Sequence, residues 1–419
     1  MLGGMKFIHG FAVLLYGLAN ANAADWPAWR GPHGDGLCDE TGLPMHWSAT
    51  ENLAWAVDLP ERGNSTPAVW GEQVFITQAI EKEGRRMVWC FDRKTGGKLW
   101  EAGTTYTEAE ATHAMNPYCA GSPATDGERV IVNFASAGVF CFDLKGREIW
   151  HRDLGKLYHI WGNGASPVLA NGLCYLNVGP SEKVKLVALD SKTGATVWER
   201  EEPRQAVPGT QPDFYGSWSD PLPRTIDGKP QLIMSWPLRV SAMEAMTGKE
   251  IWTCQGLNQL VYTSPLLSDG IVVSMGGYNG MALGVKVGGQ GDVTESHRLW
   301  HHAKSPQRIG SGAIHAGHIF ILNDPGVAQC FNLKTGEQLW QERLQGPAAT
   351  GQNWSSLVIS EGRCYAVNQG GDAFVFKASP QFELLATNSM GETVIGSMAV
   401  SDGQLFIRGY KHLFCVGRK

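Results

Sequence analysis

The sequence predicts an all-β protein: an eight-bladed β-propeller of four-stranded antiparallel blades. Three observations lead there: a short motif recurs along the chain, the tryptophans that close it are regularly spaced, and the two chain ends carry complementary parts of one blade. The chain has 419 residues, of which 43% are hydrophobic and 18% are charged. Its 52 glycines and 16 tryptophans suit many short strands joined by tight turns.

The recurring motif is a strand, a tight turn and a second strand that begins near a tryptophan. It reads CFDRKTGGKLW at residues 90–100 and returns as CFDLKGREIW, ALDSKTGATVW, AMEAMTGKEIW and CFNLKTGEQLW. Asp and Thr can bond to the local backbone and Gly accepts a positive φ, so the middle of the motif predicts a turn. Successive tryptophans are 45, 50, 48, 54, 48 and 40 residues apart, which indicates a propeller or a solenoid. We expect them to be structural, each lying against the neighbouring blade: Trp55, Trp100, Trp150, Trp198, Trp252, Trp300 and Trp340.

The chain ends predict how the ring closes. The eighth repeat stops after three strands, whereas NLAWAVDLP at residues 52–60 is a strand that precedes the first complete repeat. Pairing the two completes an eighth blade and removes the exposed sheet edges. In the fifth repeat we expect the Gly-rich residues 276–291 to form a long loop. The predicted division is a signal peptide at 1–23, an N-terminal arm at 24–51 and a propeller at 52–419.

The first residues are typical of an export signal. Lys6 precedes an apolar stretch at residues 11–19, and Ala21-Asn22-Ala23 matches a cleavage site, so we expect cleavage near Ala23. The alternative is a buried N-terminal strand or helix. No cysteine follows the apolar stretch where a lipoprotein anchor needs one, and no segment is apolar for long enough to span a bilayer. The protein is therefore expected to be exported, either periplasmic or secreted.

Charge and cysteine placement exclude other classes. The net charge of −5, without any basic run, argues against a nucleic-acid partner. Four of the nine cysteines fall at a repeat position where other copies have Ala, two more share a second repeat position, and we expect buried thiols at all six. Cys38, Cys119 and Cys254 fit no repeat position, and a bridge among them stays open.

The tryptophan-closed repeats, with the pattern A-x-D-x-x-T-G-x-x-x-W, resemble the pyrroloquinoline-quinone-like (PQQ-like) repeat family. In that family the pattern is called the tryptophan-docking motif, and the resemblance covers about residues 52–419. The resemblance implies one of two functions. Quinoprotein dehydrogenases use PQQ with calcium, a catalytic Asp and, in one branch, a vicinal disulfide. Propellers similar to the outer-membrane assembly factor BamB are non-catalytic scaffolds. The chain has no adjacent cysteine pair and no c-type haem motif, and its compact blades are closer to the second class.

A ligand site is expected where the loops leading into the innermost strands face one common mouth. Aromatic and amide side chains in these loops would make a funnel for a polar, planar or sugar-like ligand. The alternative is that several of them plug the ring and satisfy backbone groups. The candidates are Asn64, Asn116, Tyr118, Trp161, Asn163, Tyr215, Trp218, Tyr262, Arg308, Asn353 and Trp354. No catalytic residue or metal ligand is predicted, because His113, His159 and Asp213 near the same mouth lack the spacing of a zinc site.

These patterns favour an exported, monomeric binding scaffold whose partner is an envelope protein or a small polar ligand, with no cofactor. The alternative is a minimal PQQ-dependent alcohol or sugar dehydrogenase, which would hold PQQ and calcium at the channel mouth.

Overall fold

The computed structural model describes residues 25–180, 184–202, 205, 214–277, 280–304, 309–348 and 350–417. The predicted signal peptide, Asp213 and Arg308 lie outside these residues. The described chain is nearly all β, with one short helix, α1 (Thr294–His297), and two single turns of 3-10 helix at Glu81–Glu83 and Ala135–Ala137. No helix in this part of the chain has the length and apolar character needed to cross a membrane.

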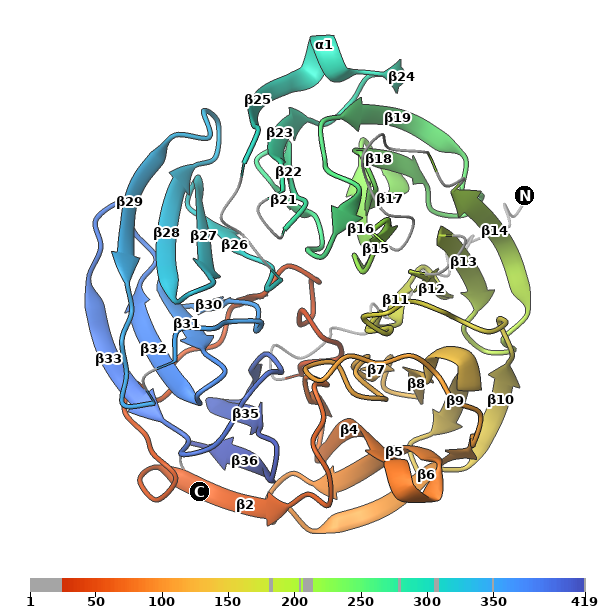
Figure 1. The fold of residues 1–419 in the computed structure, drawn as a ribbon, viewed down its shortest axis with the longest axis vertical. Coiled ribbons are helices and arrows are strands. Elements are labelled where there is room, and N and C mark those ends of the chain that lie inside the picture. The colour runs from red at the N-terminus through yellow and green to blue at the C-terminus, as the bar shows by residue number, and fades with distance from the viewer. Residues whose placement is uncertain are drawn as a thin grey trace, which may run out of the picture.

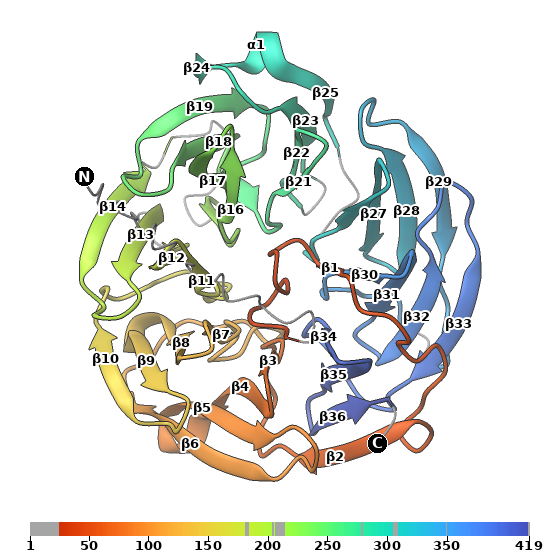
Figure 2. The ribbon, with the colours of Figure 1, turned by 180° about the vertical axis from the view of Figure 1, so that it is seen from behind.

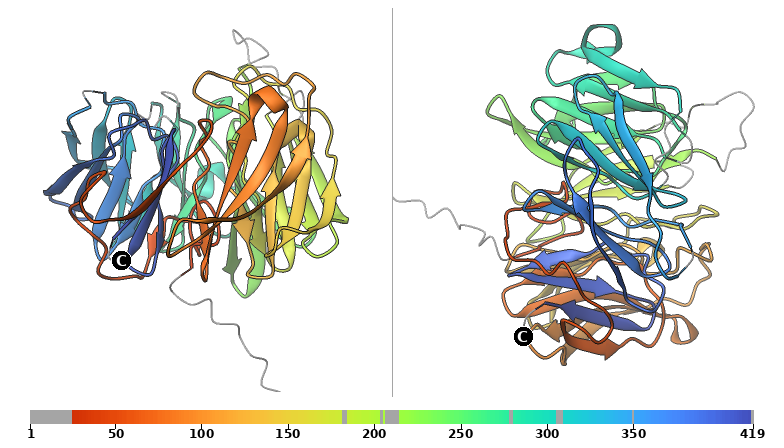
Figure 3. Two further views of the ribbon diagram at one scale, coloured as in Figure 1. Left: turned by 90° about the horizontal axis from the view of Figure 1, so that it is seen from below. Right: turned by 90° about the vertical axis from the view of Figure 1, so that its left-hand side faces the viewer.

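Eight four-stranded antiparallel sheets surround a central axis, seen along the axis in Figure 1 and in profile in Figure 3. The predicted eight-bladed propeller is confirmed. Blades 1 to 4 consist of β3 (Ala68–Trp70), β4 (Gln73–Ile80), β5 (Arg85–Asp92), β6 (Lys98–Thr105); β7 (Ala124–Thr125), β8 (Arg129–Asn133), β9 (Val139–Asp143), β10 (Glu148–Arg152); β11 (Val168–Ala170), β12 (Leu173–Val178), β13 (Val184–Asp190), β14 (Thr196–Glu202); and β16 (Leu222–Ile226), β17 (Lys229–Trp236), β18 (Arg239–Glu244), β19 (Glu250–Gln255). Blades 5 to 8 consist of β21 (Leu266–Ser268), β22 (Ile271–Met275), β23 (Ala282–Lys286), β25 (Arg298–His302); β26 (Ala313–His315), β27 (His318–Asn323), β28 (Val327–Asn332), β29 (Gln338–Arg343); β30 (Val358–Ser360), β31 (Arg363–Val367), β32 (Asp372–Lys377), β33 (Leu384–Ser389); and β34 (Ala399–Ser401), β35 (Gln404–Arg408), β36 (His412–Val416), β2 (Leu53–Asp58).

The ring closes between the chain ends, as predicted. Strand β2 pairs antiparallel with β36, and Trp55 stands opposite Cys415. Blade 8 therefore takes three strands from the end of the chain and its outermost strand from the beginning, which Figure 2 shows beside the C-terminus.

Adjacent blades are joined by the turn-and-tryptophan motif. In blade 1, Asp92 Oδ1 accepts hydrogen bonds from the backbone amide and the hydroxyl of Thr95, both at 2.8 Å. This turn places Gly96 at φ 73°, where a Cβ atom would lie 2.7 Å from the Trp55 ring. The Trp55 indole Nε1 donates to Arg93 O at 2.7 Å. The same indole-to-backbone bond reaches the next blade from Trp100, Trp150, Trp198, Trp300 and Trp340.

Blade 5 departs from this pattern, which leaves one tryptophan differently placed. Trp252 is buried, and its Nε1 has no hydrogen-bond partner among the described residues. The turn that should receive it is replaced by β24 (Gly291–Asp292), which instead runs parallel beside β19.

The prediction of a long loop over residues 276–291 is wrong, because β23 lies within this segment and pairs with β22. Both faces of β23 are covered by neighbouring blades, so the strand has no polar alternation to reveal it. Its Gly284 stands opposite Trp300, and a Cβ there would lie 2.3 Å from the indole. Gly284 therefore occupies the position that other blades give to Ala or Cys.

All nine cysteines lie within the described residues, and all are free and buried. The bridge left open among Cys38, Cys119 and Cys254 does not form. Cys90 stands opposite Trp100 as a small residue beneath the ring, and burial raises the pKa of its thiol to about 12.

The N-terminal arm is largely irregular, and it crosses the centre of the ring before it reaches β2 (Figure 2). Trp26 forms an isolated bridge with Val69, and β1 (Leu37–Cys38) adds a parallel strand to blade 7 beside β30.

Candidate functional site

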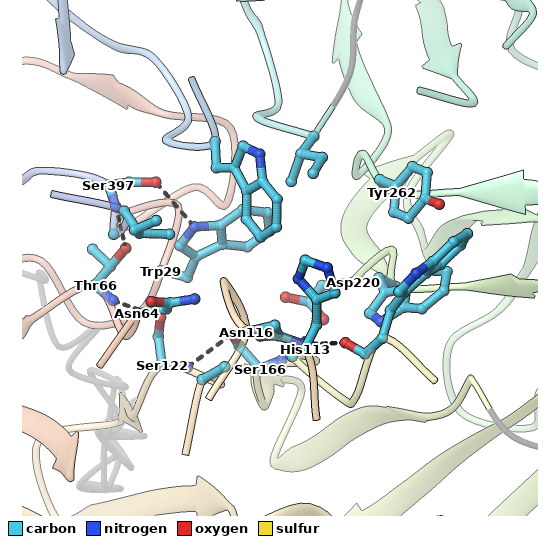
Figure 4. Close-up of a pocket in the computed structure, with 18 residues that line it drawn as sticks. Trp29, Asn64, Thr66, His113, Asn116, Ser122, Ser166, Asp220, Tyr262 and Ser397 are labelled. Atoms are coloured by element: carbon cyan, nitrogen blue, oxygen red, sulfur yellow. Dashed lines mark hydrogen bonds between the residues drawn. The ribbon is translucent and has the colours of Figure 1, made fainter. Parts of the chain in front are cut away.

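The loops before the innermost strands enclose a cavity of about 290 Å³ at the mouth of the central channel. Figure 4 shows Trp29 on one side of this cavity and Tyr262 on the other, with His113 and Asp220 between them in this view. We call this space the mouth cavity.

One wall of the mouth cavity is a stacked aromatic pair. Short strands β15 (Gly216–Ser217) and β20 (Leu260–Val261) pair in parallel, which brings Trp218 and Tyr262 side by side at their ends. The Trp218 amide donates to Val261 O at 2.8 Å and continues this pairing. The two ring centroids are 4.9 Å apart, with an interplanar angle of 24°.

Trp161 extends the aromatic wall. Its ring lies 6.0 Å from Trp218 and 6.2 Å from Tyr262, centroid to centroid. The buried His159 meets Trp218 edge-on at 4.8 Å, and Phe214 meets Trp161 edge-on at 5.2 Å. Edge-to-face and offset contacts of this kind hold rings in place, so the wall is preformed.

The opposite side of the cavity comes from the N-terminal arm. The Trp29 side chain borders the mouth cavity and also a second cavity of about 600 Å³, which is lined largely by the arm and by blades 2 to 4. Its indole Nε1 donates to Ser397 Oγ at 3.3 Å. The arm therefore separates the two cavities within the channel.

Arg30 anchors the arm in this position. Its guanidinium is buried and donates hydrogen bonds to the backbone oxygens of Gly312, Ser311 (3.4 Å), Leu357 (3.2 Å) and Asp35 (2.7 Å). Burial lowers the pKa of Arg30 to about 10. A buried cation held by four carbonyl oxygens, three of them outside the arm, ties the arm to blades 6 and 7.

Below the aromatic rings, a closed circle of hydrogen bonds links all eight blades. In each link, a backbone N–H donates to the side-chain oxygen of the equivalent residue in the next blade, at 2.9–3.1 Å. We call this circle the belt. Its members in order are Thr66, Ser122, Ser166, Asp220, Ser264, Ser311, Ser356 and Ser397, which donates back to Thr66.

Asp220 is the one acidic member of the belt. Its Oδ1 accepts the Ser166 amide at 3.0 Å, in the way that a hydroxyl does elsewhere in the belt. Only 5% of Asp220 is exposed, and burial raises the pKa of its carboxyl group to about 8. The residue borders both channel cavities.

The amides of the mouth cavity hold its loops in place. Asn64 Nδ2 donates to Met115 O at 2.7 Å, and Asn116 Nδ2 donates to Trp161 O at 2.7 Å. His113 Nδ1 accepts the Met115 amide at 3.2 Å, and the imidazole stacks 6.4 Å from Trp354. The two amide bonds connect the loops of successive blades, and the contact between His113 and Trp354 reaches across the cavity to a blade that is distant in sequence.

The structure brings six of the predicted funnel residues together and separates the others. Asn64, Asn116, Trp161, Trp218, Tyr262 and Trp354 line the mouth cavity. Tyr118 and Asn163 border a separate narrow cavity, where Arg86 lies 3.7 Å from the Tyr118 ring centroid.

Two predicted funnel residues are interior residues instead. Tyr215 is 3% exposed and Asn353 is fully buried, and neither lines the mouth cavity. Asn353 Nδ2 donates to Leu322 O at 2.7 Å and so braces its loop, which is the structural role that the sequence left open. Arg308 lies outside the described residues.

Sequence reasoning missed Trp29 and Asp220. Nothing in the repeats places the arm inside the channel, so the sequence contains no pattern that would assign Trp29 to the site. For Asp220 such a pattern exists, because SDP at residues 219–221 carries an acid where the other loops carry Ser or Thr. Within the described residues, no group of three or more His, Cys, Asp or Glu side chains could hold a metal ion.

These features define an eight-bladed propeller of the PQQ-like repeat class with a cavity at its channel mouth. The chain belongs to the family described as outer membrane protein assembly factor BamB, whose sequence profile matches residues 39–175 and 182–419.

Solved structures agree with this fold. BamB from Moraxella catarrhalis is 14% identical with a TM-score of 0.61, and the match covers 88% of this chain and 97% of that one. A europium-containing methanol dehydrogenase is 12% identical with a TM-score of 0.71, covering 94% and 91%. The quinohemoprotein alcohol dehydrogenase from Comamonas testosteroni is 13% identical with a TM-score of 0.68, covering 95% and 82%. At these identities the similarity establishes the fold alone. No curated protein sequence matches the chain.

The fold class raises the question of whether the mouth cavity suits PQQ and calcium. PQQ is a planar quinone with three carboxylate groups, so its site needs cationic donors. Among the described residues that line the cavity, none is Lys or Arg, and the one acidic side chain is Asp220. One carboxylate is a poor set of calcium ligands, because calcium takes six to eight oxygens. The residues present do not fit this cofactor pair.

Proposed function

We propose that the protein is an exported, monomeric binding propeller that holds a small polar ligand in the mouth cavity and does not catalyse a reaction. The observation that carries this proposal is the preformed aromatic wall of Trp161, Trp218 and Tyr262 above the polar belt. Apolar walls with a few fixed polar groups are typical of small-molecule sites.

The polar groups of the cavity favour binding over chemistry. Asn64 and Asn116 donate to neighbouring loops, and His113 Nδ1 accepts a backbone amide. Asp220 Oδ1 belongs to the belt. A general base must be free to reach the proton it removes, whereas these groups are engaged in holding the cavity open.

An envelope protein is the second candidate for the same mouth. Large apolar side chains beside Trp161 are exposed: 61% of Tyr158, 36% of Ile160 and 36% of Phe214. Exposed apolar side chains that gather beside a cavity often mark a contact surface. The family description, an outer membrane protein assembly factor, supports a partner of this kind.

Calorimetric titration with a panel of sugars, amino acids and amines tests the proposal. We expect at least one class to bind, and Trp161→Ala to weaken that binding by about tenfold or more, since it removes part of the wall. Leu99→Ala is the control, because this side chain is 52% exposed on the outer strand β6. If no panel member binds, and Trp161→Ala leaves capture of envelope proteins unchanged, the proposal is wrong.

The dehydrogenase alternative has its own test. The purified protein is incubated with PQQ and calcium, and its quinone absorbance and dye-linked alcohol and sugar oxidation are measured. We expect neither signal, because the described lining of the cavity lacks cationic groups for the three carboxylates. Turnover that depends on PQQ would establish the enzyme instead.

A further inference from the structure

The belt does not require an acid at any of its eight positions. Seven links use a Ser or Thr hydroxyl as the acceptor, at the same distances as the link to Asp220. A hydroxyl therefore suffices to join one blade to the next. Asp220 must be explained by something other than the architecture.

The acid at this position is costly to the fold. Asp220 is 5% exposed, and placing a carboxylate in such an environment disfavours its charged form. The raised pKa of this carboxyl group, about 8, has desolvation as its largest cause. A serine would complete the belt without this cost, so a carboxyl group that borders the mouth cavity indicates a ligand that compensates for the burial of its charge.

The surroundings of Asp220 indicate the charge of that ligand. Among the described residues that line the mouth cavity, Asp220 is the one acid, and neither Lys nor Arg is present. The walls are aromatic rings: Trp218 and Tyr262 are stacked, with Trp161 beside them and Trp29 across the cavity. Aromatic faces attract cations, and Trp attracts them most strongly.

We propose that the mouth cavity selects a small organic cation, a quaternary ammonium or protonated amine group, with Asp220 as its counter-ion. This inference rests on the proposed function and names the ligand class for the same site. Trp161, Trp218 and Tyr262 contact the cationic group from one side and Trp29 from the other, and the carboxylate neutralises it. Binding of the cation replaces the water that Asp220 loses on burial.

Choline and 3,3-dimethylbutan-1-ol test the proposal, because they differ by one charged nitrogen in place of a carbon. Calorimetry at pH 8.5 should give at least tenfold tighter binding for choline, which is 1.4 kcal/mol. Asp220→Ser keeps a belt acceptor and removes the carboxylate, so this preference should fall to less than about threefold while binding of the alcohol changes little.

Leu99→Ala is the control, since this side chain is 52% exposed on the outer strand β6 and belongs neither to the belt nor to the lining of the mouth cavity. It should retain the preference for choline. If Asp220→Ser does not fold, as judged by circular dichroism, Asp220→Asn replaces it.

The outcomes separate this inference from the proposed function. Equal binding of the two compounds, or an unchanged preference in Asp220→Ser, overturns the cationic class. If neither compound binds while a sugar does, the cationic class is also wrong, but the binding propeller stands. The binding propeller itself falls only if the whole ligand panel and the protein-capture experiment fail.

Discussion

Replacing Asp220 with serine should stabilise the ligand-free protein, by an amount that increases with pH. The substitution gives the fourth belt position a hydroxyl, which is the acceptor that seven of the eight links already use. The hydrogen bond from the Ser166 amide is retained, and the buried carboxyl group is removed.

The magnitude follows from proton linkage. Burial raises the pKa of Asp220 from its ordinary 3.8 to about 8. Below about pH 3 the carboxyl group is protonated in both the folded and the unfolded chain, so its burial then adds no pH-dependent cost to folding. As the pH rises, the unfolded chain loses the proton while the folded chain keeps it. The free energy of unfolding then falls by about 1.4 kcal/mol for each pH unit. The cost is about 2 kcal/mol at pH 5 and about 6 kcal/mol above pH 8, so the difference between the two conditions is about 4 kcal/mol.

Calorimetric melting of the wild type and Asp220→Ser at pH 5 and pH 9 measures this difference. For 419 residues, the unfolding entropy is about 0.9 kcal/mol/K. The advantage of the variant in Tm should therefore grow by about 5 °C between the two pH values. The other ionisable residues that line the two cavities are the same in both proteins, so their contributions cancel in the difference between the variant and the wild type. These residues are Arg30, His33, Asp35, His113 and Arg224. An advantage that is constant with pH would refute the reasoning, because it would show that Asp220 is not held protonated in the folded chain.

Three further predictions concern the ring. Gly96→Ala should lower the free energy of unfolding by about 2–4 kcal/mol in a urea titration, because the residue has φ 73° and a new Cβ would lie 2.7 Å from Trp55. Gly71→Ala is its control, with φ 53° and open space at the Cβ, so it should cost only about 1 kcal/mol; equal losses would contradict the tryptophan contact. In the same titration, Trp150→Phe should lower the free energy of unfolding by about 1 kcal/mol more than Trp252→Phe does. Trp150 Nε1 donates to Ser191 O, whereas Trp252 Nε1 has no partner among the described residues. A larger loss for Trp252→Phe would contradict this role of the indole bond. At pH 8 the native protein should give almost no reaction with Ellman's reagent and nine thiols per chain in guanidinium, because all nine are buried and free; fast native labelling would contradict this burial.

The fold could be predicted because its determinants repeat. The spacing of the tryptophans, the TG turn and the small residue opposite each ring recur from blade to blade, and each copy supports the others. Blade 5 shows the limit of this reasoning. Gly284 replaces the usual Ala or Cys opposite Trp300, so strand β23 resembled a loop although it pairs normally.

The site was only partly predictable because its parts do not repeat. The loop position identified the wall residues Trp161, Trp218 and Tyr262, since each lies shortly before the innermost strand of its blade. Position alone could not separate them from Asn353, which has the same kind of loop but turns inward to Leu322 O. Trp29 reaches the cavity through the path of the arm, and that path depends on the contacts of Arg30 with residues about 280 to 330 positions away.

The pairing of β2 with β36 determines when the fold can be completed during synthesis. In synthesis from the N-terminus, residues 53–58 emerge before any complete blade and must wait for residues 412–416. Blades 1 to 7 can form as local units meanwhile, because the contacts within each are close in sequence. Closure needs both ends of the chain, because it forms the β2–β36 pair and, in the belt, the bond from Ser397 to Thr66. Until that event the molecule is an open arc with an unpaired edge at each end, the state in which it is most exposed to aggregation or exchange with another copy.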